Sequence, residues 1–210
     1  MKTVPAWWVL RAILPLVLLS DFSSAVNAAS VFNFDGDPID RGTEFSDTSN
    51  GISATFTSPG DPGGFGVQQS FFSGLTGNVL IDPGPAGLDR LPLTIRFSSL
   101  MGSLDLDFAV NATDPVPLTL AAFFDGAAVG TVAASGALPS ADSQAREGHI
   151  SFHEASFNSI TLTSDANDFA VDNLTVAETS SAPEPASFWL IGVGMALAST
   201  RPVAKHFRRR

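Results

Sequence analysis

The stretch LDLDFAV, residues 104–110, contains the pattern that decides the fold. Its apolar residues recur at every second position, so Leu104, Leu106, Phe108 and Val110 share one face of an extended chain. Strict alternation of this kind predicts a β-strand that packs one face on a core and turns the other face to water.

Similar alternation recurs along the middle of the chain. Leu118, Leu120 and Ala122 alternate before Asp125-Gly126, which is a strong signal for a hairpin turn. Helical periodicity is nearly missing, and the small, polar residues 134–148 predict a long loop. The sequence therefore predicts an all-β, two-sheet β-sandwich of about nine to ten strands. We expect strands at residues 31–34, 52–57, 93–97, 104–110, 118–124, 128–133, 149–152, 159–163 and 169–176, with weaker signals at 71–72 and 78–81.

Two residue types are missing from the 210 residues, cysteine and tyrosine. Without cysteine, no disulfide framework and no thiolate metal site can form. All three tryptophans lie in the terminal segments, so the middle lacks the Trp and Tyr rings that usually stack on sugars. Phe65, Phe71 and Phe72, beside Gly-rich loops, are the only substitutes, and such residues more often belong to the core.

Charge is distributed very unevenly along the chain. From Ser30 to Glu178 there are 19 Asp and Glu against four Arg and no Lys, which leaves this segment with a net charge of −15. The remaining cations lie at the two ends. An anionic middle segment is repelled by nucleic acid phosphates and by anionic lipid, so we expect no nucleic acid partner.

The first 28 residues have the order of a secretory signal peptide. Lys2 provides a positive start, an apolar piece follows at 12–19, and residues 26–28 (Val-Asn-Ala) fit the small-x-small cleavage rule. The apolar piece is too short to cross a hydrocarbon core of about 30 Å. We expect export and cleavage after Ala28. The alternative is an uncleaved membrane anchor, which Arg11 disfavours because it interrupts the apolar stretch.

The other end of the chain has three parts in a fixed order. A Pro-Glu-Pro sequence comes first, an apolar stretch at 188–198 follows, and a basic cluster closes the chain. The prolines keep their segment extended, so a protease can read it. The apolar stretch partitions into lipid, and the terminal cations stay on the cytoplasmic side. The residues concerned are Pro183, Glu184 and Pro185, then Arg201, Lys205, Arg208, Arg209 and Arg210.

This order resembles the PEP-CTERM sorting signal of Gram-negative bacteria, in which a membrane-embedded exosortase recognises and processes the tail. The resemblance covers residues 183–210. It implies an exosortase as processing partner, a transient inner-membrane intermediate, and a final place at the cell surface or in the extracellular matrix. Arg201-Pro202 departs from the pattern, because it limits the apolar run to 188–200, short of the ~20 residues that span a bilayer. Snorkelling by Arg201 and Lys205 could compensate. The alternative is a generic tail anchor without processing.

These features divide the chain into four parts. We expect a signal peptide (1–28), a β-sandwich domain (29–177), a linker with the Pro-Glu-Pro motif (178–185), and a transmembrane and basic sorting tail with a short apolar helix (186–210). The opening run 31–35 and the closing run 169–176 resemble the jelly-roll domains often seen in PEP-CTERM proteins. This resemblance implies that the first and last strands are neighbours.

Aspartates cluster at turns near both ends of the domain. If the first and last strands are neighbours, Asp35 and Asp172 could share a Ca²⁺ ion, which prefers carboxylate and carbonyl oxygens. Many carbohydrate-binding jelly rolls hold a structural Ca²⁺ in a comparable place. The alternative is that these aspartates cap turns. The residues in the two clusters are Asp35, Asp37 and Asp40, then Asp165, Asp168 and Asp172.

His149 and His153 are the histidines of the middle segment, and their surroundings read as a strand. Two imidazoles on one strand face can bind a metal, but no third ligand is apparent, so the pattern favours a solvated strand face. No Gly-x-Ser-x-Gly elbow is present, and nothing marks a carboxylate pair for glycoside hydrolysis.

Three functions therefore stay open. The first is a non-catalytic exported protein of structural or interaction type, at the cell surface or in a polysaccharide matrix. The second is a Ca²⁺-assisted carbohydrate-binding module at the same address. The third is an exported hydrolase with unmarked carboxylates. Because no motif marks an active site, we expect the first and predict no enzyme.

Overall fold

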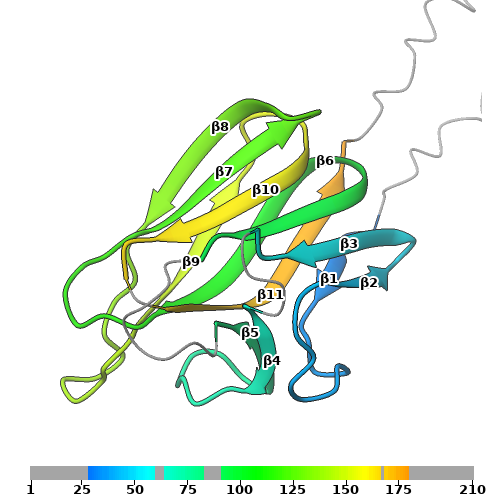
Figure 1. Ribbon diagram of the computed structural model, residues 1–210. Coiled ribbons are helices and arrows are strands. Elements are labelled where there is room, and N and C mark those ends of the chain that lie inside the picture. The colour runs from blue at the N-terminus through cyan, green and yellow to red at the C-terminus, as the bar shows by residue number, and fades with distance from the viewer. Residues whose placement is uncertain (1–27, 60–63, 83–90, 167, 180–210) are drawn as a thin grey trace, which may run out of the picture. The chain divides into compact units, whose positions relative to one another are not determined.

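The structure is a computed structural model, and it describes residues 28–59, 64–82, 91–166 and 168–179. The described residues form eleven antiparallel strands (Figure 1) and contain no helix long and apolar enough to cross a membrane. The all-β prediction is confirmed. The predicted leader before Ala28 and the sorting tail with Pro183, Glu184 and Pro185 lie outside the described residues. The strands are β1 (Ser30–Phe32), β2 (Phe45–Ser49), β3 (Ile52–Thr57), β4 (Gly66–Gln69), β5 (Asn78–Ile81), β6 (Leu93–Val110), β7 (Leu118–Phe124), β8 (Ala127–Ala134), β9 (Arg146–Phe152), β10 (Phe157–Ser164) and β11 (Phe169–Glu178).

The longest strand, β6, belongs to both layers of the fold. Its first half pairs with β3 and β10, and its second half pairs with β9 and β11. Core-facing residues fall at odd positions from Leu93 to Met101 and at even positions from Leu104 to Val110. Because successive side chains of a strand point to opposite faces, this change of phase turns the strand over between Met101 and Leu104. One strand can therefore line the core from both sides.

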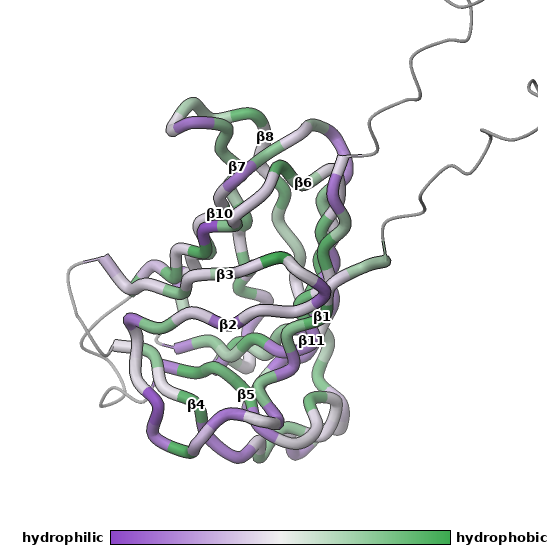
Figure 2. The backbone as a smooth tube through the Cα atoms, turned by 90° about the vertical axis from the view of Figure 1, so that its right-hand side faces the viewer, coloured by the Kyte–Doolittle hydropathy of each residue, from purple (hydrophilic) through white to green (hydrophobic). Residues whose placement is uncertain are grey.

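All eleven strands form one continuous sheet that folds over on itself into two layers (Figures 1 and 2). The first layer has the order β2-β3-β6-β10-β7-β8. In the second layer, β6 lies between β9 and β11. The far edge of β11 pairs with β5 at residues 170–171 and with β1 at residues 174–176. β4 pairs with the other edge of β5. The two layers of the predicted two-sheet β-sandwich are present, but β6 joins them into a single sheet.

Phenylalanines fill much of the core between the layers. Phe56 is fully buried and lies against the rings of Phe34 and Phe45, with centroids 5.4 and 5.0 Å away. Phe157 meets Phe97 from the first layer and Phe152 from the second, at 6.0 and 5.5 Å. The edge-on and offset geometries are those that aromatic pairs prefer. These contacts connect the strands of the two layers.

A smaller apolar cluster lies on the outer face of the second layer. Ala109 of β6 and Ala170 of β11 are paired in register, and Leu75, Val79 and Ile81 cover them. The segment between β4 and β5 lies over this part of the sheet, with Phe72 packed against the cluster. The outer face is thus closed at the Ala109 end of β6 and open at the Asp105 end.

Several details differ from the sequence prediction. The strands expected at 93–97 and 104–110 are one strand, because residues 98–103 stay extended where β6 passes between layers. Phe71 and Phe72 lie in the segment between β4 and β5 and not in a strand. The predicted loop 134–148 is shorter, because β9 begins at Arg146. β2 and β4 were not predicted, since each has few buried apolar residues.

Two other predictions are confirmed. Asp125 and Gly126 have φ of 49° and 84°, the left-handed pair that a type I′ hairpin turn requires between β7 and β8. The first strand pairs with the last, with Val31 opposite Thr175 (Figure 2). The carboxylates near both ends of the domain are therefore brought to one region.

Candidate functional site

Polar side chains form a row on the open part of the outer face of the second layer. Asp105 and Asp107 alternate with the core residues of β6, so their side chains point outward. The register places Asp105 opposite Ser151 and Asp107 opposite His149 on β9. Asn173 of β11 reaches the same place from the other side of β6. We call these five residues the polar row.

His149 lies between two carboxylates. Its Nδ1 is 2.9 Å from Asp107 Oδ1, and its Nε2 is 3.3 Å from Asp105 Oδ1. The hydrogen bond with Asp107, followed by that with Asp105, raises the pKa of His149 above its usual value. The imidazole is 54% exposed, so it faces solvent within an anionic surface. It is the only side chain of the polar row that can carry a positive charge.

Asp105 accepts hydrogen bonds from β9. Ser151 Oγ donates to its Oδ1 at 2.6 Å, and His153 Nε2 lies 3.5 Å from the same oxygen. Partial burial acts to raise the pKa of Asp105, but the hydrogen bonds from Ser151 and His149 outweigh it and lower the pKa. This carboxylate therefore stays ionised and is held toward β9.

An irregularity in β11 brings Asn173 to the polar row. The register with β6 shifts between Asp172 and Thr175, and Asn173 has φ of 50°, which asparagine tolerates better than most residues. Its amide donates to Asp107 Oδ2 at 3.1 Å. Asp107 therefore has a partner on each side, His149 and Asn173.

Asp172, one of the two predicted Ca²⁺ ligands, is a buried carboxylate. It is 1% exposed, and its Oδ1 accepts the backbone N–H of Asn173 at 2.7 Å. Desolvation raises the pKa of Asp172 to about 6, with further contributions from the charges of Asp35 and Asp107. The ionised form of Asp172 is thus disfavoured by burial and by the nearby negative charges of Asp35 and Asp107.

Asp35, the other predicted ligand, lies near enough for its charge to act on Asp172. It accepts the backbone N–H of Asn78 at 2.8 Å, and its carboxylate lies over Gly77, which has φ of 77° and no room for a Cβ. The structure therefore places the two aspartates in one region. Within the described ranges, no three or more His, Asp or Glu side chains are arranged as a ready-made metal site. A shared Ca²⁺ ion stays a prediction.

Asp37, of the same acidic cluster, forms a different contact. Arg41 pairs with Asp37 and with Asp47, the latter at 2.8 Å, and its guanidinium lies 4.2 Å from the centre of the Phe45 ring. At the other end of the domain, Asp168 accepts the amide of Asn111 at 2.8 Å. Both aspartates are thus paired with side chains of the domain itself.

An exposed aromatic ring is carried by the segment between β4 and β5. Phe71 is 74% exposed and lies against Phe72, with ring centroids 4.2 Å apart. The next residues, Ser73 and Gly74, donate their backbone N–H groups to Glu147 at 2.8 and 2.6 Å. Glu147 is on β9, two residues from His149 and on the same face. Phe72 therefore supports the ring, and Glu147 attaches the segment that carries it to the face of β9 on which His149 lies.

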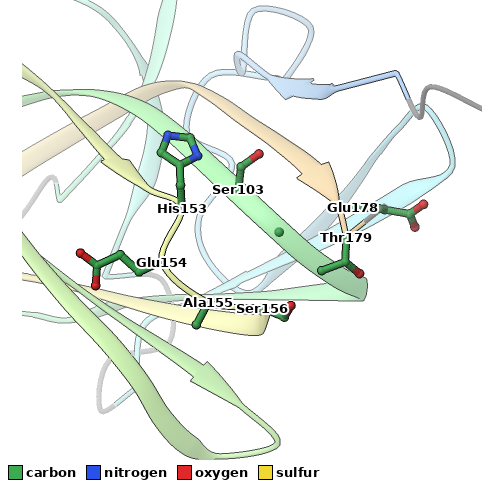
Figure 3. Close-up of a pocket in the computed structure, with 8 residues that line it drawn as sticks. Ser103, His153, Glu154, Ala155, Ser156, Glu178 and Thr179 are labelled. Carbon is green, nitrogen blue, oxygen red and sulfur yellow. The ribbon is translucent and has the colours of Figure 1, made fainter. Parts of the chain in front are cut away.

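A shallow hollow of about 470 Å³ lies at the other end of the row (Figure 3). It includes Ser103, which continues the outward side of β6, and His153, which faces Asp105. Figure 3 shows Glu154 pointing away from the Glu178 side of the hollow. The remaining lining residues are Gly102, Ala155, Ser156 and Thr179. Among the described residues, this end of the outer face therefore offers a shallow, open hollow.

Sequence reasoning recognised the individual residues but not the row. The alternation in 104–110 already placed Asp105 and Asp107 outward, and His149 was expected on a strand. What brings them together is the register between β6 and β9, which are 35 residues or more apart in the chain. Phe65, one of the proposed aromatic substitutes, is fully buried, while Phe71 is exposed.

No protein-family model and no curated protein matches the chain. Among solved structures, the chain is similar to a mutant of the family 29 carbohydrate-binding module CBM29-2, with 14% identity, a TM-score of 0.36, and coverage of 75% of this chain and 99% of that one. It is also similar to the catalytic domain of a GH87 alpha-1,3-glucanase in complex with nigerose, with 13% identity, a TM-score of 0.39, and coverage of 76% and 30%. At TM-scores below 0.5, these likenesses carry no functional inference for this chain.

Proposed function

We propose that this protein is an exported cell-surface or extracellular-matrix protein whose β-sandwich binds polysaccharide, as a binding module and not as an enzyme. The observation that carries the proposal is the exposed ring of Phe71 in a segment that Glu147 attaches to β9, on the face of β9 that also carries His149 of the polar row. The sequence motifs at the two termini support export, and the structure of the outer face supports the ligand class.

The chemistry of the outer face suits a sugar polymer. Carboxylates of Asp105 and Asp107 accept hydrogen bonds from hydroxyl groups, while the amide of Asn173 and the imidazole of His149 donate them. An exposed aromatic ring offers an apolar platform for the C–H face of a sugar ring. Small ligands usually need a concave pocket, whereas this face is open and its hollow is shallow. The negative charge of the surface favours a neutral or cationic polymer.

Phe71→Ala should weaken binding to the preferred polysaccharide about tenfold, because it removes the exposed ring and leaves the core intact. The assay is electrophoretic retardation in gels that contain neutral, cationic or anionic polymers, preceded by a glycan array that selects the polymer. Each run is repeated with Ca²⁺ and with a chelator, which also tests the predicted ion between Asp35 and Asp172.

The matched control is Phe124→Ala, which removes another exposed ring, 43% exposed, from the β7–β8 hairpin of the first layer. We expect this variant to bind like the wild type. Equal retardation of the Phe71→Ala variant and the wild type by every polymer would contradict the proposed site.

Truncation before Pro183 or the substitution Glu184→Ala should change the cellular location of the domain. The three-part order of the tail motivates this expectation, since the Pro-Glu-Pro segment is the part that an exosortase would read. Fractionation of the native host, with mass spectrometry of the mature chain, gives both the location and the two cleavage points. Ala186→Ser, next to the motif, is the control. An unchanged location and mass for both tail variants would count against sorting.

A further inference from the structure

Three potential metal ligands meet at the edge of the polar row. Asp105 Oδ1 lies 3.3 Å from the Nε2 atom of His149 and 3.5 Å from the Nε2 atom of His153. The imidazoles are 54% and 55% exposed and the Asp105 side chain 37%, so solvent and ions reach all three. The two histidines come from β9 and the residue after it, and the aspartate comes from the second half of β6.

The spacing between these donor atoms suits a tetrahedral cation. Zinc binds imidazole nitrogen at about 2.0–2.1 Å and carboxylate oxygen at about 2.0–2.2 Å, so adjacent ligand atoms of a tetrahedral site are roughly 3.3–3.5 Å apart. The two distances from Asp105, 3.3 and 3.5 Å, fall in this range. The three groups are not already gathered around one point, but half-exposed side chains can turn at little cost.

The groups behind these ligands are those that orient a metal-bound histidine. The Nδ1 atom of His149 faces Asp107 at 2.9 Å, while its Nε2 atom faces Asp105 at 3.3 Å and the hydroxyl of Ser151 at 3.0 Å, so Nε2 is the ring nitrogen on the side of the other two ligands. Asp107 is itself held by the amide of Asn173 at 3.1 Å, and Ser151 holds Asp105 at 2.6 Å. A carboxylate behind a ligating imidazole fixes the ring and strengthens the ligand.

We propose that His149, His153 and Asp105 bind a divalent transition metal ion of the Zn²⁺ type, with water completing the coordination. Imidazole is a good ligand for Zn²⁺, Cu²⁺ and Ni²⁺ and a poor one for Ca²⁺, so this site is distinct from the Ca²⁺ prediction at Asp35 and Asp172. It also does not require Phe71 or the binding of a polysaccharide. The third ligand was not apparent from the sequence because it comes from a different strand.

The test is calorimetric titration of the purified full chain, prepared without a polyhistidine tag, with Zn²⁺ and separately with Ca²⁺. Co²⁺ serves as an optical probe, since its visible absorption reports tetrahedral coordination. We expect one Zn²⁺ per chain. His149→Ala, His153→Ala and Asp105→Asn should each weaken binding at least tenfold, and Asp107→Asn should weaken it less.

Two controls make the outcome decisive. His206→Ala removes the remaining histidine of the chain and should leave Zn²⁺ affinity unchanged. Phe71→Ala should also leave it unchanged, which separates this proposal from polysaccharide binding. Thermal melts of each variant without metal confirm that the domain is folded. Absence of Zn²⁺ binding, or an affinity that survives both His149→Ala and His153→Ala in folded protein, would overturn the proposal.

Discussion

Replacing Asp172 by asparagine should stabilise the protein at pH 7–8 by about 2 kcal/mol. Asp172 is 1% exposed, and desolvation raises its pKa from 3.8 to about 6. A shift of this size corresponds to about 3 kcal/mol of cost for the buried charge. Asparagine removes the charge but replaces one accepting oxygen by an amide NH₂, which forfeits about 1 kcal/mol of hydrogen bonding.

The sign of this effect depends on pH. Because the pKa of Asp172 is higher in the folded state than in the unfolded state, the folded state holds the extra proton between pH 4 and 6. Stability from this group is therefore greatest below about pH 4, falls as the pH rises toward 6, and is constant above. The Asp172→Asn variant should be more stable than wild type at pH 7 and slightly less stable near pH 4.

Urea unfolding at intervals from pH 4 to pH 8 measures this difference. Asp125→Asn is the control, because Asp125 is an exposed carboxylate in the β7–β8 turn, where φ is 49° and asparagine fits equally well. We expect this control to show no comparable change of sign. A stability difference between the Asp172→Asn variant and wild type that does not vary with pH would show that the buried charge is not the cause.

The predictable parts of the fold are those that depend on residues close together in the sequence. Alternation of Leu104, Leu106 and Phe108 identified a half-buried strand, and all three are fully buried. Asp125-Gly126 identified a turn whose φ values depend only on those two residues. Such signals are local because the period of a strand and the sterics of a turn are properties of the backbone.

The parts that were not predictable depend on residues far apart in the chain. The sequence of residues 98–103 contains no signal that β6 continues from one layer to the other. Its pairing there with β10 and β11 depends on tertiary structure. β2 has a single buried residue, Phe45, so its pairing with β3 decides its structure more than its own pattern does. The Asn50-Gly51 turn before β3, with φ of 47° and 83°, was the available signal for this hairpin.

The candidate site follows the same division. Asp105 and Asp107 could be placed on an outward face from alternation alone, but their partners could not. A slip of one residue in the register between β6 and β9 would turn His149 and Ser151 to the other face. The polar row therefore exists only because the core residues Ile150 and Phe152 fix that register from the opposite side of β9.

The substitution Phe157→Ala should destabilise the domain by about 3–5 kcal/mol, the largest loss that we expect from a single change. Phe157 is fully buried at the point where β6 changes layer, opposite Met101. Its ring contacts Phe97 in the first layer and Phe152 in the second. Truncation leaves a cavity that neither layer can fill alone, because β6 fixes the spacing between them.

Urea unfolding measures this loss, with Phe124→Ala as the matched control. Phe124 is 43% exposed at the end of β7, so its removal should change the free energy of unfolding by about 0.5 kcal/mol or less. Because the polar row is held in register by the core behind it, Phe157→Ala should also increase hydrogen exchange in the second half of β6 and in β9. A loss of stability below about 1.5 kcal/mol, or faster exchange confined to β10, would contradict this prediction. Either result would show that contacts other than those of Phe157 hold the two layers together.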